Sequence, residues 1–281
     1  GRCGFRCVCV GSSYSAPMEI DAASPDAKLY PQERHARILA LVASRGRVEV
    51  TTLADELDVT TETIRRDLTK LVRQGLVRRV HGGAIHVERL GYEPTMTVRG
   101  ERFSAEKERV ARAALDLLPD GGSISIDSGT TTMSLARLLP QDRPITVVTN
   151  SIPAAGLLST MQKVDFFLLG GRVRSRTAAA VGRWATSALA DVVVDVAFMG
   201  TNGLTVEHGL TTPNPEESAT KAAMVAAARR VVLLTDHSKV GAVQFCKFAN
   251  VHELDVIVTD TGLDDETAER LSQCGPDVLR V

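Results

Sequence analysis

A run of small polar residues follows the apolar segment SISI and precedes a segment with a helical apolar stripe. A glycine, several hydroxyl groups and the free N–H groups of a helix start can together bind phosphate. A helix start capped by a threonine has the same sequence, so both interpretations stay open. Neither G-x-x-x-x-G-K-[ST] nor G-x-G-x-x-G occurs, which removes the main support for nucleoside triphosphate or dinucleotide binding. The residues of this run are Asp127, Ser128, Gly129, Thr130, Thr131 and Thr132.

Glycines and short polar residues also follow other apolar segments that we expect to be strands. Asn150 follows ITVVT, Gly170 and Gly171 follow FFLL, and Lys239 comes shortly after VVLLTD. Ligands of parallel sheets bind beyond the carboxyl ends of the strands, where all these residues would lie. Lys239 could neutralise a phosphate there, although an ordinary surface lysine is the alternative.

A second group of residues whose side chains could bind a partner lies in the segment TTETIRRDLTKLVRQG. If Ile64, Leu68 and Leu71 form the buried stripe of a helix capped by Thr60, its other threonines, its arginines and Lys70 face outward. Arginine can bond guanine in a bidentate manner, and threonine offers a hydroxyl to phosphate and a methyl to thymine. The pattern therefore indicates a DNA-reading helix, with a merely solvated helix face as the alternative.

The elements around this helix predict a winged helix-turn-helix. We expect a first helix over residues 31–46, a second after a cap at Thr52, the third after Thr60, and then a hairpin in LVRRVHGGAIHV. His81 and His86 lack cysteine or carboxylate partners at metal-site spacing, so we expect no metal there. The candidate DNA-binding residues are Thr52, Thr60, Thr61, Thr63, Arg65, Arg66, Lys70, Arg78, Arg79 and His81.

The longer C-terminal part alternates helical segments with continuously apolar strands, from KERVARAALDLL to the final VLRV. This alternation predicts an α/β domain with a mainly parallel sheet that is covered on both faces. Residues 87–104 have no clear periodicity and are expected to link the two domains. The expected organisation is an extension over residues 1–28, a DNA-binding domain over 29–86, the linker, and a second domain over 105–281.

The chain has 281 residues, of which 44% are hydrophobic and 24% charged, as in soluble globular proteins. No apolar run is long enough to predict a membrane span. The formal net charge of −1 hides a split between the two parts. Residues 33–89 hold 11 basic and 8 acidic side chains, or +3, whereas residues 90–281 hold 19 and 23, or −4. Such asymmetry favours a nucleic-acid partner for the basic part.

The chain has five cysteines, and Cys3, Cys7 and Cys9 are crowded near the N terminus. They have no second ligand pair at zinc-site spacing, so we predict neither a metal site nor a disulfide framework. Residues 1–28 are expected to be a disordered extension. The apolar patch FRCVCV is short and is interrupted by Arg6, so we expect no signal peptide. The expected location is therefore the cytoplasm.

Two sets of motifs resemble those of the DeoR-type bacterial transcriptional regulators. The segment VTTLADELDVTTETIRRDLTKLVRQGLVRRVHGGA is similar to their winged helix-turn-helix. The order D-x-G-T-T-T, T-N, L-G-G, G-L-T-T-x-N and D-x-S-K is similar to their effector domain. The resemblance implies a sugar-phosphate sensor with a ribose-5-phosphate isomerase-like fold that is not itself an enzyme. The candidate effector-binding residues are Asp127, Ser128, Gly129, Thr130, Thr131, Thr132, Asn150, Gly170, Gly171, Glu217, Lys221 and Lys239.

The sequence departs from this resemblance on the sugar side of the expected pocket. Thr201 and Asn202 stand where an Ala-Asp pair is expected, and Ser218 stands where an alanine is expected. Glu217 and Lys221 are spaced i, i+4, so a surface ion pair on one helix is the alternative to a role in binding.

The favoured hypothesis is a repressor of a carbohydrate-metabolism operon that binds double-stranded operator DNA under the control of a phosphorylated sugar or polyol. It needs no cofactor, metal or membrane, and we expect a homo-oligomer, a dimer or tetramer, because one recognition helix reads one half-site. The competing hypothesis is a sugar-phosphate isomerase-like enzyme with an accessory DNA-binding module, in which Asp127 or Asp236 would be the catalytic base.

Overall fold

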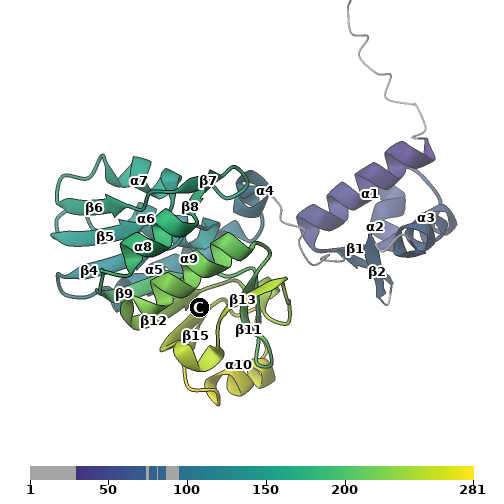
Figure 1. Ribbon diagram of the computed structural model, residues 1–281. Helices are drawn as coiled ribbons and strands as arrows, with labels where there is room; N and C mark the ends of the chain where they lie inside the picture. The colour runs from purple at the N-terminus through teal and green to yellow at the C-terminus, as the bar shows by residue number, and fades with distance from the viewer. Residues whose placement is uncertain (1–29, 74–75, 81, 87–94) are drawn as a thin grey trace, which may run out of the picture.

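The computed structural model describes residues 30–73, 76–80, 82–86 and 95–281, and shows the two parts of the chain (Figure 1). The predicted N-terminal extension and its three cysteines lie outside these ranges, as does His81. Within the described ranges, every helix is too short or too polar to span a bilayer. In the same ranges no cluster of three or more His, Cys, Asp or Glu side chains could hold a metal ion.

The N-terminal part has the predicted helices and hairpin. The first helix begins at Pro31, and Gly46 follows its last residue with a φ of +74°, which favours glycine. The third helix is capped as predicted, because the Thr63 N–H donates to Thr60 Oγ1 over 3.2 Å. The elements are α1 (Pro31–Arg45), β1 (Arg47–Glu49), α2 (Val50–Glu56), α3 (Thr61–Arg73), β2 (Val77–Val80) and β3 (Gly83–His86).

The predicted cap at Thr52 is wrong. Helix α2 begins at Val50, so Thr52 lies inside its first turn. The buried Val48 and Val50 carry the chain directly from β1 into the helix, and the Val50 N–H donates to Gly82 O over 2.9 Å. A backbone acceptor from the hairpin therefore does what a side-chain cap was expected to do.

The hairpin strands form an antiparallel sheet in the order β1-β3-β2. Gly83 pairs with Glu49, and a Cβ built on it would lie 2.0 Å from the carbonyl oxygen of Val48. A side chain at this position would thus separate β1 from the wing. The apolar sides of α1, α2 and α3 meet this sheet in one core, formed by Ile38, Val42, Val48, Val50, Leu53, Ala54, Leu57, Ile64, Leu68, Leu71, Val77 and Ala84.

The predicted linker contains a short helix, α4 (Met96–Glu101), which has no apolar stripe to reveal it in the sequence. Helix α5 follows at once (Ser104–Ala114), after Phe103 with a φ of +54°. The part of the expected linker that the structure describes, residues 95–104, is therefore largely helical. Residues 87–94 lie outside the described ranges.

The C-terminal part is built on a seven-stranded sheet in the order β15-β14-β12-β9-β4-β5-β6, and all its neighbouring strands are parallel. This confirms the predicted α/β class. The strands are β4 (Ser123–Ile126), β5 (Ile145–Thr149), β6 (Val164–Leu168), β9 (Val194–Met199), β12 (Ala228–Leu234), β14 (Val256–Thr259) and β15 (Asp277–Arg280).

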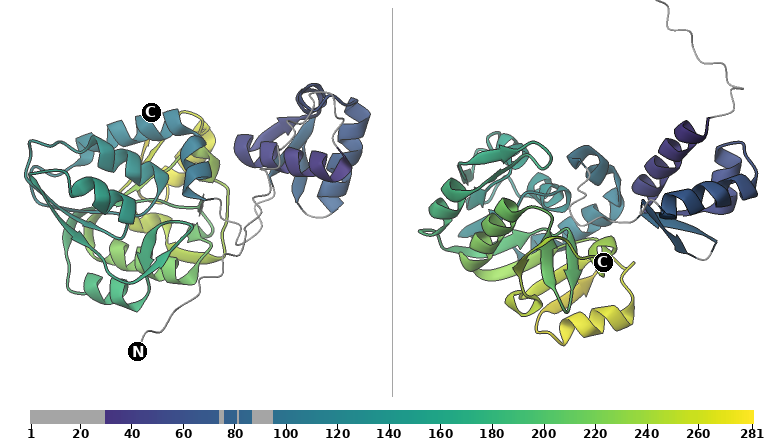
Figure 2. Two further views of the ribbon diagram at one scale, coloured as in Figure 1. Left: turned by 90° about the horizontal axis from the view of Figure 1, so that it is seen from above. Right: turned by 45° about the vertical axis from the view of Figure 1, so that its right-hand side comes forward.

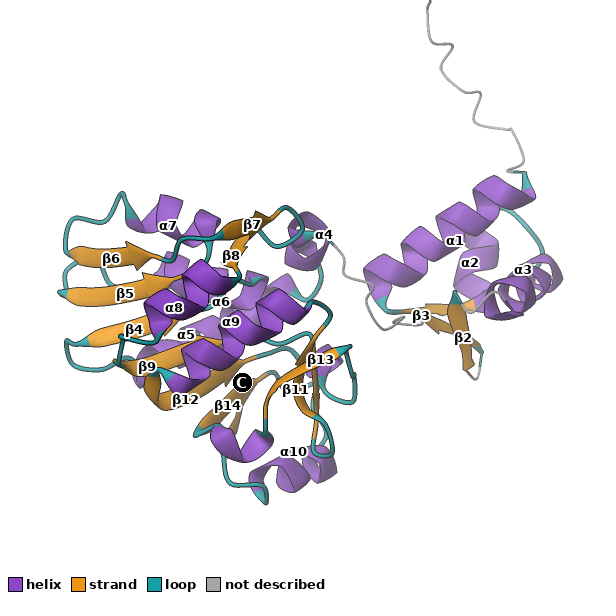
Figure 3. Ribbon diagram, viewed as in Figure 1, coloured by secondary structure: helices purple, strands orange, loops and turns teal. Residues whose placement is uncertain are grey.

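Helices cover both faces of this sheet, because successive residues of each strand pack on opposite sides. On β9, Val196 and Phe198 pack with α5, α6 and α7, whereas Ala197 and Met199 pack with α8, α9 and α10. Helices α8 and α9 lie in front of the sheet in Figure 3, and Figure 2 shows the same ribbon from two further directions. The helices not yet bounded are α6 (Thr130–Leu138), α7 (Ile152–Leu158), α8 (Arg183–Leu189), α9 (Pro215–Ala226) and α10 (Asp265–Ser272).

Two small antiparallel sheets were not predicted. Strands β10, β11 and β13 pack with α9 on one face of the main sheet, and β7 and β8 form a separate hairpin. The one-turn helix η2 follows β12. The bounds are β7 (Arg172–Arg174), β8 (Ala179–Val181), β10 (Gly203–Thr205), β11 (Gly209–Thr212), β13 (Cys246–Ala249), η1 (Leu115–Leu117), η2 (His237–Lys239) and η3 (Val251–Glu253).

Candidate functional site

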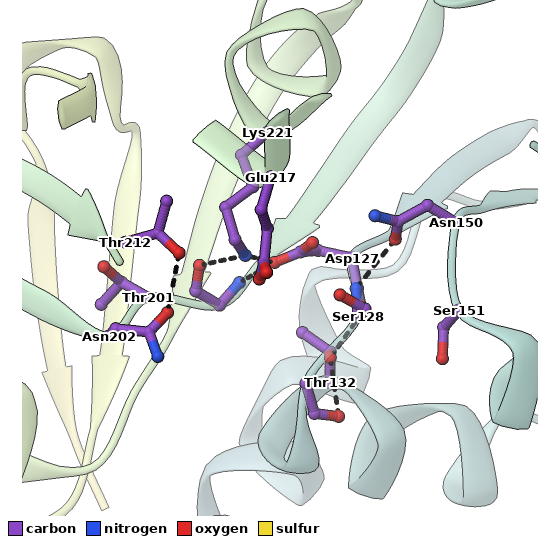
Figure 4. Close-up of polar contacts among 12 residues, drawn as sticks. Asp127, Ser128, Thr132, Asn150, Ser151, Thr201, Asn202, Thr212, Glu217 and Lys221 are labelled. Atoms are coloured by element: carbon purple, nitrogen blue, oxygen red, sulfur yellow. Dashed lines mark hydrogen bonds and ion pairs between the residues drawn. The ribbon is translucent and has the colours of Figure 1, made fainter. Parts of the chain in front are cut away.

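Polar residues that follow β4, β5 and β9 lie together, because the carboxyl ends of parallel strands share one edge. Asp127, directly after β4, is 1% exposed. Its Oδ2 accepts a hydrogen bond of 3.0 Å from the Gly200 N–H and forms an ion pair with Lys221 Nζ (Figure 4). Lys221 reaches this carboxylate from α9 and also donates to Gly200 O over 3.1 Å. A buried charge pair therefore joins β4, β9 and α9.

Glu217 and Lys221 do not form a surface ion pair on their helix, so that alternative is wrong. Both side chains are buried, at 1% exposure each. Glu217 pairs instead with Arg174 of β7, while Lys221 pairs with Asp127. Glu217 and Lys221 of α9 thus both point toward the strand ends, as Figure 4 shows.

Three buried polar atoms near this pair have no hydrogen-bond partner in the described part of the chain. They are Asp127 Oδ1, Ser128 Oγ and Asn150 Nδ2. Asn150 is fully buried, and its Oδ1 accepts from the Ser128 N–H over 2.9 Å, so its amide nitrogen is left over. An unmade hydrogen bond of a buried group costs about 1–3 kcal/mol. One acceptor, one hydroxyl and one amide donor have the chemistry to bond a hydroxyl group, but Asp127, Ser128 and Asn150 do not themselves line the cavity beside α6.

The run after β4 leads into α6 without a threonine cap. Gly129 is the cap residue and makes no side-chain hydrogen bond, while α6 starts at Thr130. The Thr132 hydroxyl turns back and donates to Asp127 O over 2.6 Å, which holds the loop against the strand. The alternative of a threonine-capped helix start is therefore wrong, and the first N–H groups of α6 have no side-chain cap.

A cavity opens beside this helix start. Lys239 lines it from η2, Arg99 from α4, Arg102 from the turn between α4 and α5, and Lys107 from α5. The last three cations lie in or beside the segment expected to be a linker, so sequence reasoning missed them. The remaining lining residues are Phe103, Gly129, Thr130, Thr131, Thr132, Gly200, Thr201, Asn202, Leu234, Thr235, Asp236 and Gln244.

The positive charge around the cavity affects the pKa of Lys107. The side chain is 5% exposed and donates to Arg99 O over 2.6 Å and to Arg102 O. Burial lowers the pKa of Lys107 to about 8; the Asp236 carboxylate opposes this, and nearby Lys239, Arg99 and Arg102 add to it. The cavity is therefore crowded with positive charge.

Gly170 and Gly171 follow β6, at the far end of the same edge. Gly171 has a local structural role, since a Cβ at its φ of +141° would lie 2.6 Å from Val181 O in β8. Gly170 is exposed. Neither glycine lines the cavity beside α6.

The outward face of α3 has the predicted composition. Arg65, Arg66, Thr69 and Lys70 are exposed, and Thr61 and Thr63 are half-buried. An ion pair of 3.6 Å joins Arg65 to Glu62 on the same face. Thr52 and Thr60 are exposed as well, and Arg79 is exposed on β2, next to Arg78 in the chain. The predicted DNA-binding residues that the structure describes thus belong to α2, to α3 and its cap Thr60, and to the first strand of the wing.

Asp67 is a residue of α3 that sequence reasoning did not single out. It is 3% exposed and pairs with two residues of α1, Arg34 at 2.5 Å and His35 at 2.9 Å. Burial would raise the pKa of Asp67, but the hydrogen bonds and charges of Arg34 and His35 outweigh it and hold that pKa below its ordinary value. This clamp sets the position of the helix that carries the exposed arginines.

Both parts of the chain match models of one protein family. Residues 34–89 match the DeoR-like helix-turn-helix domain, and residues 102–261 match the DeoR C terminal sensor domain. The chain belongs to the DeoR family. This confirms the resemblance carried by the TIRRDL, HGGA and D-x-G-T-T-T motifs.

Relatives in the DeoR family cover almost the whole chain. It is 39% identical over 251 residues to the HTH-type transcriptional regulator GlpR of Haloferax volcanii, across 89% of this chain and 98% of that protein. It is 32% identical over 251 residues to the HTH-type transcriptional repressor GlcR of Bacillus subtilis, across 89% and 96%. Among solved structures, ribose 5-phosphate isomerase A from Methanocaldococcus jannaschii matches 49% of this chain and 55% of that chain. The two chains are 19% identical there, with a TM-score of 0.37.

Proposed function

We propose that this DeoR-family chain is a DNA-binding repressor of a carbohydrate-metabolism operon, and that a phosphorylated sugar or polyol controls its operator affinity. The observation that carries the proposal is the cationic cavity at the uncapped start of α6, next to buried polar atoms without partners. A phosphate and a set of hydroxyl groups are the two chemistries that these neighbouring regions suit.

The phosphate would lie at the α6 N terminus. The N–H groups of Thr130, Thr131 and Thr132 begin the helix there, and Lys239 faces the same cavity. Peptide dipoles and free N–H groups favour an anion at this end of a helix. The hydroxyl groups of the Gly129–Thr132 run and the ammonium group of Lys239 would add hydrogen bonds.

The sugar or polyol would extend toward Asp127 and Asn150. The charges of Asp127 and Glu217 are already matched by Lys221 and Arg174. The ligand therefore need not bring a charge to this side, and hydroxyl groups would complete the hydrogen bonds of Asp127 Oδ1, Ser128 Oγ and Asn150 Nδ2. Gly170 and Gly171 would border this side only.

The DNA-binding half of the proposal rests on α3. Its exposed arginines and Lys70 lie on the side of the helix opposite the core residues Ile64, Leu68 and Leu71. Such a face suits the major groove, with the wing and Arg78, Arg79 and His81 toward the phosphate backbone. A homo-oligomer, a dimer or tetramer, would present a recognition helix to each half-site, and light scattering of the purified chain tests this.

The known roles in the names of two relatives support the repressor role. These relatives are the transcriptional repressors GlcR of Bacillus subtilis and CsqR of Escherichia coli. Regulation requires that the effector bind the DNA-competent and DNA-incompetent arrangements with different affinity. The cytoplasmic location stays a prediction.

The deciding experiment uses operator duplexes selected from a random library with the purified chain. A panel of sugar phosphates is then tested for release of the selected duplex. Thr131→Ala combined with Lys239→Ala should keep DNA binding and lose the response to the effector, because only the cavity changes. Thr160→Ala combined with Lys163→Ala, at two exposed positions between α7 and β6, is the matched control and should respond like the wild type. An unchanged response of the first pair would place the effector elsewhere.

The isomerase-like alternative finds no support in the described site. The Asp127 carboxylate could contact a ligand through Oδ1, but its Oδ2 pairs with Lys221 and accepts from the Gly200 N–H, which gives it a structural role in joining β4, β9 and α9. Asp236 accepts from the Ser238 N–H over 3.1 Å, which fixes the turn of η2. Turnover of a pentose phosphate by the purified chain, abolished by Asp127→Asn, would favour the enzyme instead.

A further inference from the structure

The segment that joins the two domains forms the second wall of the effector cavity. In this wall, Arg99 lies in α4, Arg102 lies in the turn between α4 and α5, and Lys107 lies in the first turn of α5. Helix α4 packs against α6: a Cβ built on Gly100 would lie 3.9 Å from Thr130 Cγ2. The chain that leads to the DNA-binding domain thus lies directly over the proposed phosphate position.

This wall is strongly cationic. Among the lining residues, Arg99, Arg102, Lys107 and Lys239 carry positive charge, and Asp236 is the carboxylate among them. Lys107 Nζ lies 4.0 Å from Asp236 Oδ2, so that carboxylate is already matched by a buried cation. Lys239, Arg99 and Arg102 also lie close enough to Lys107 to lower its pKa by charge repulsion, and a dianion among these cations would relieve that repulsion.

Arg102 contacts both domains. A Cβ built on Gly46, which follows α1 in the DNA-binding domain, would lie 3.1 Å from Arg102 Nη2. The Nε atom of Arg102 is buried without a hydrogen-bond partner among the described residues. Its guanidinium group lies 5.8 Å from the centre of the Phe103 ring, and that ring packs edge-on against His237 of η2, with the centres 4.9 Å apart. The same side chain therefore borders the effector cavity and touches the first domain.

We propose that Arg99 and Arg102 bind the phosphate of the effector together with the α6 N terminus and Lys239, so that ligand occupancy sets the position of the interdomain segment. The proposal rests on the proposed function, since it concerns the same cavity. Arginine suits this role because its planar group binds phosphate in a bidentate manner. Lys107 is a positioning residue, because its ammonium group holds the carbonyl groups of Arg99 and Arg102.

The proposal also explains how binding reaches the DNA-binding domain. A guanidinium group that turns toward a bound phosphate must change its contact with Gly46. The coupling then needs no long chain of intermediates, since one residue lies at both places. The ligand would shift the balance between two placements of the winged helix-turn-helix by its differential contacts with Arg102.

Inorganic phosphate and the full chain are sufficient for the test. Calorimetric titration gives the affinity, and hydrogen exchange reports residues 128–133 and residues 99–107 separately. In the wild type, phosphate should slow exchange in both segments. In Arg99→Gln combined with Arg102→Gln, the affinity should fall about 10- to 100-fold through loss of charged hydrogen bonds. At saturating phosphate this variant should still show protection at residues 128–133 but none at 99–107. Arg109→Gln combined with Arg112→Gln, exposed on α5, is the control and should behave like the wild type.

The possible failures are distinguishable. Wild-type affinity in the Arg99 and Arg102 variant, or wild-type protection at residues 128–133 alone, overturns this inference and leaves the phosphate site at α6 intact. Phosphate protection at neither segment in the wild type overturns both the inference and the proposed function. The wild-type arm decides this even if the double variant does not fold. Arg102→Lys adds a milder test, since it keeps the charge and should lose only the bidentate contribution.

Discussion

Replacement of Lys221 by methionine tests whether the buried charge pair is as the structure has it. Lys221 and Asp127 are each 1% exposed, so the substitution leaves a carboxylate buried without its cation. Removing one partner of a buried pair costs about 3–5 kcal/mol, whereas an exposed pair contributes about 0.2–1 kcal/mol. We therefore expect Lys221→Met to lower the free energy of unfolding of the sensor domain by about 3–5 kcal/mol.

Adding Asp127→Asn should recover part of this loss. The second substitution removes the unpaired charge, and the asparagine oxygen can still accept from the Gly200 N–H. The double variant should thus be more stable than Lys221→Met alone, and the non-additivity measures the pair itself. A merely crowded site would instead show two losses that add.

The assay is urea unfolding, followed by far-UV circular dichroism and by the fluorescence of Trp184, the single tryptophan, which lies on α8. The control is Arg112→Met, which removes an exposed i, i+4 pair with Glu108 on α5 and should cost about 0.5 kcal/mol or less. If Lys221→Met costs no more than this control, the buried pair does not exist and the argument from burial is wrong.

Three further predictions concern the DNA-binding face and the pH dependence of the two parts. Arg65→Ala or Arg66→Ala should weaken operator binding by about 1–3 kcal/mol and relax specificity at one base pair, as competition with mutated duplexes would show; unchanged binding by both variants would refute the role of α3. Asp67→Asn should lower the thermal stability of the DNA-binding domain at about pH 7 and flatten its decline in acid. The wild-type contribution is present above the ordinary aspartate pKa of 3.8 and is lost as the pH falls through the lowered one. Phosphate binding should weaken as the pH rises through about 8, where Lys107 loses its proton, and calorimetric titration of Lys107→Met should show a flatter pH profile.

Periodicity predicted the large elements well. In a long amphipathic helix or a continuously apolar strand, the order of apolar and polar residues reflects which sides of the element are buried. The stripe of Ile64, Leu68 and Leu71 predicted helix α3, and all three side chains are buried. Strands β7, β8 and β10 have only three residues each, too few for any period to be visible. Helix α4 is likewise a single short segment, and tertiary packing against α6 accounts for its presence better than its own composition.

The site was predictable where it depends on position along a strand, and unpredictable where it depends on long-range partners. Asp127 and Asn150 follow strands of one parallel sheet, so the sequence could place them at one edge. The ion-pair partner of Lys221 could not be predicted, because an i, i+4 spacing with Glu217 is the same whether the two side chains are exposed or buried. Its partner Asp127 lies 94 residues away. Arg99 and Arg102 were not predicted as site residues for a similar reason. The sequence does not show that the expected linker packs against α6, and only this packing brings the two arginines to the cavity.

The departures from the family resemblance have unequal consequences. Ser218 donates to Lys247 O over 2.8 Å and Thr201 donates to Gly203 O over 2.8 Å, so both hydroxyl groups are used to hold β13 and β10. Thr201 and Asn202 both line the cavity beside α6, where Asn202 Oδ1 accepts from Thr212 over 3.1 Å. The resemblance leads one to expect an aspartate there, which would place a second carboxylate in the cavity besides Asp236. A neutral amide keeps the cavity more positive, which favours a doubly charged phosphate over a ligand with a lower negative charge. Asn202→Asp should therefore weaken phosphate binding while leaving the folds of β10 and β13 unchanged, and a wild-type affinity in this variant would show that Asn202 lies too far from the anion to matter.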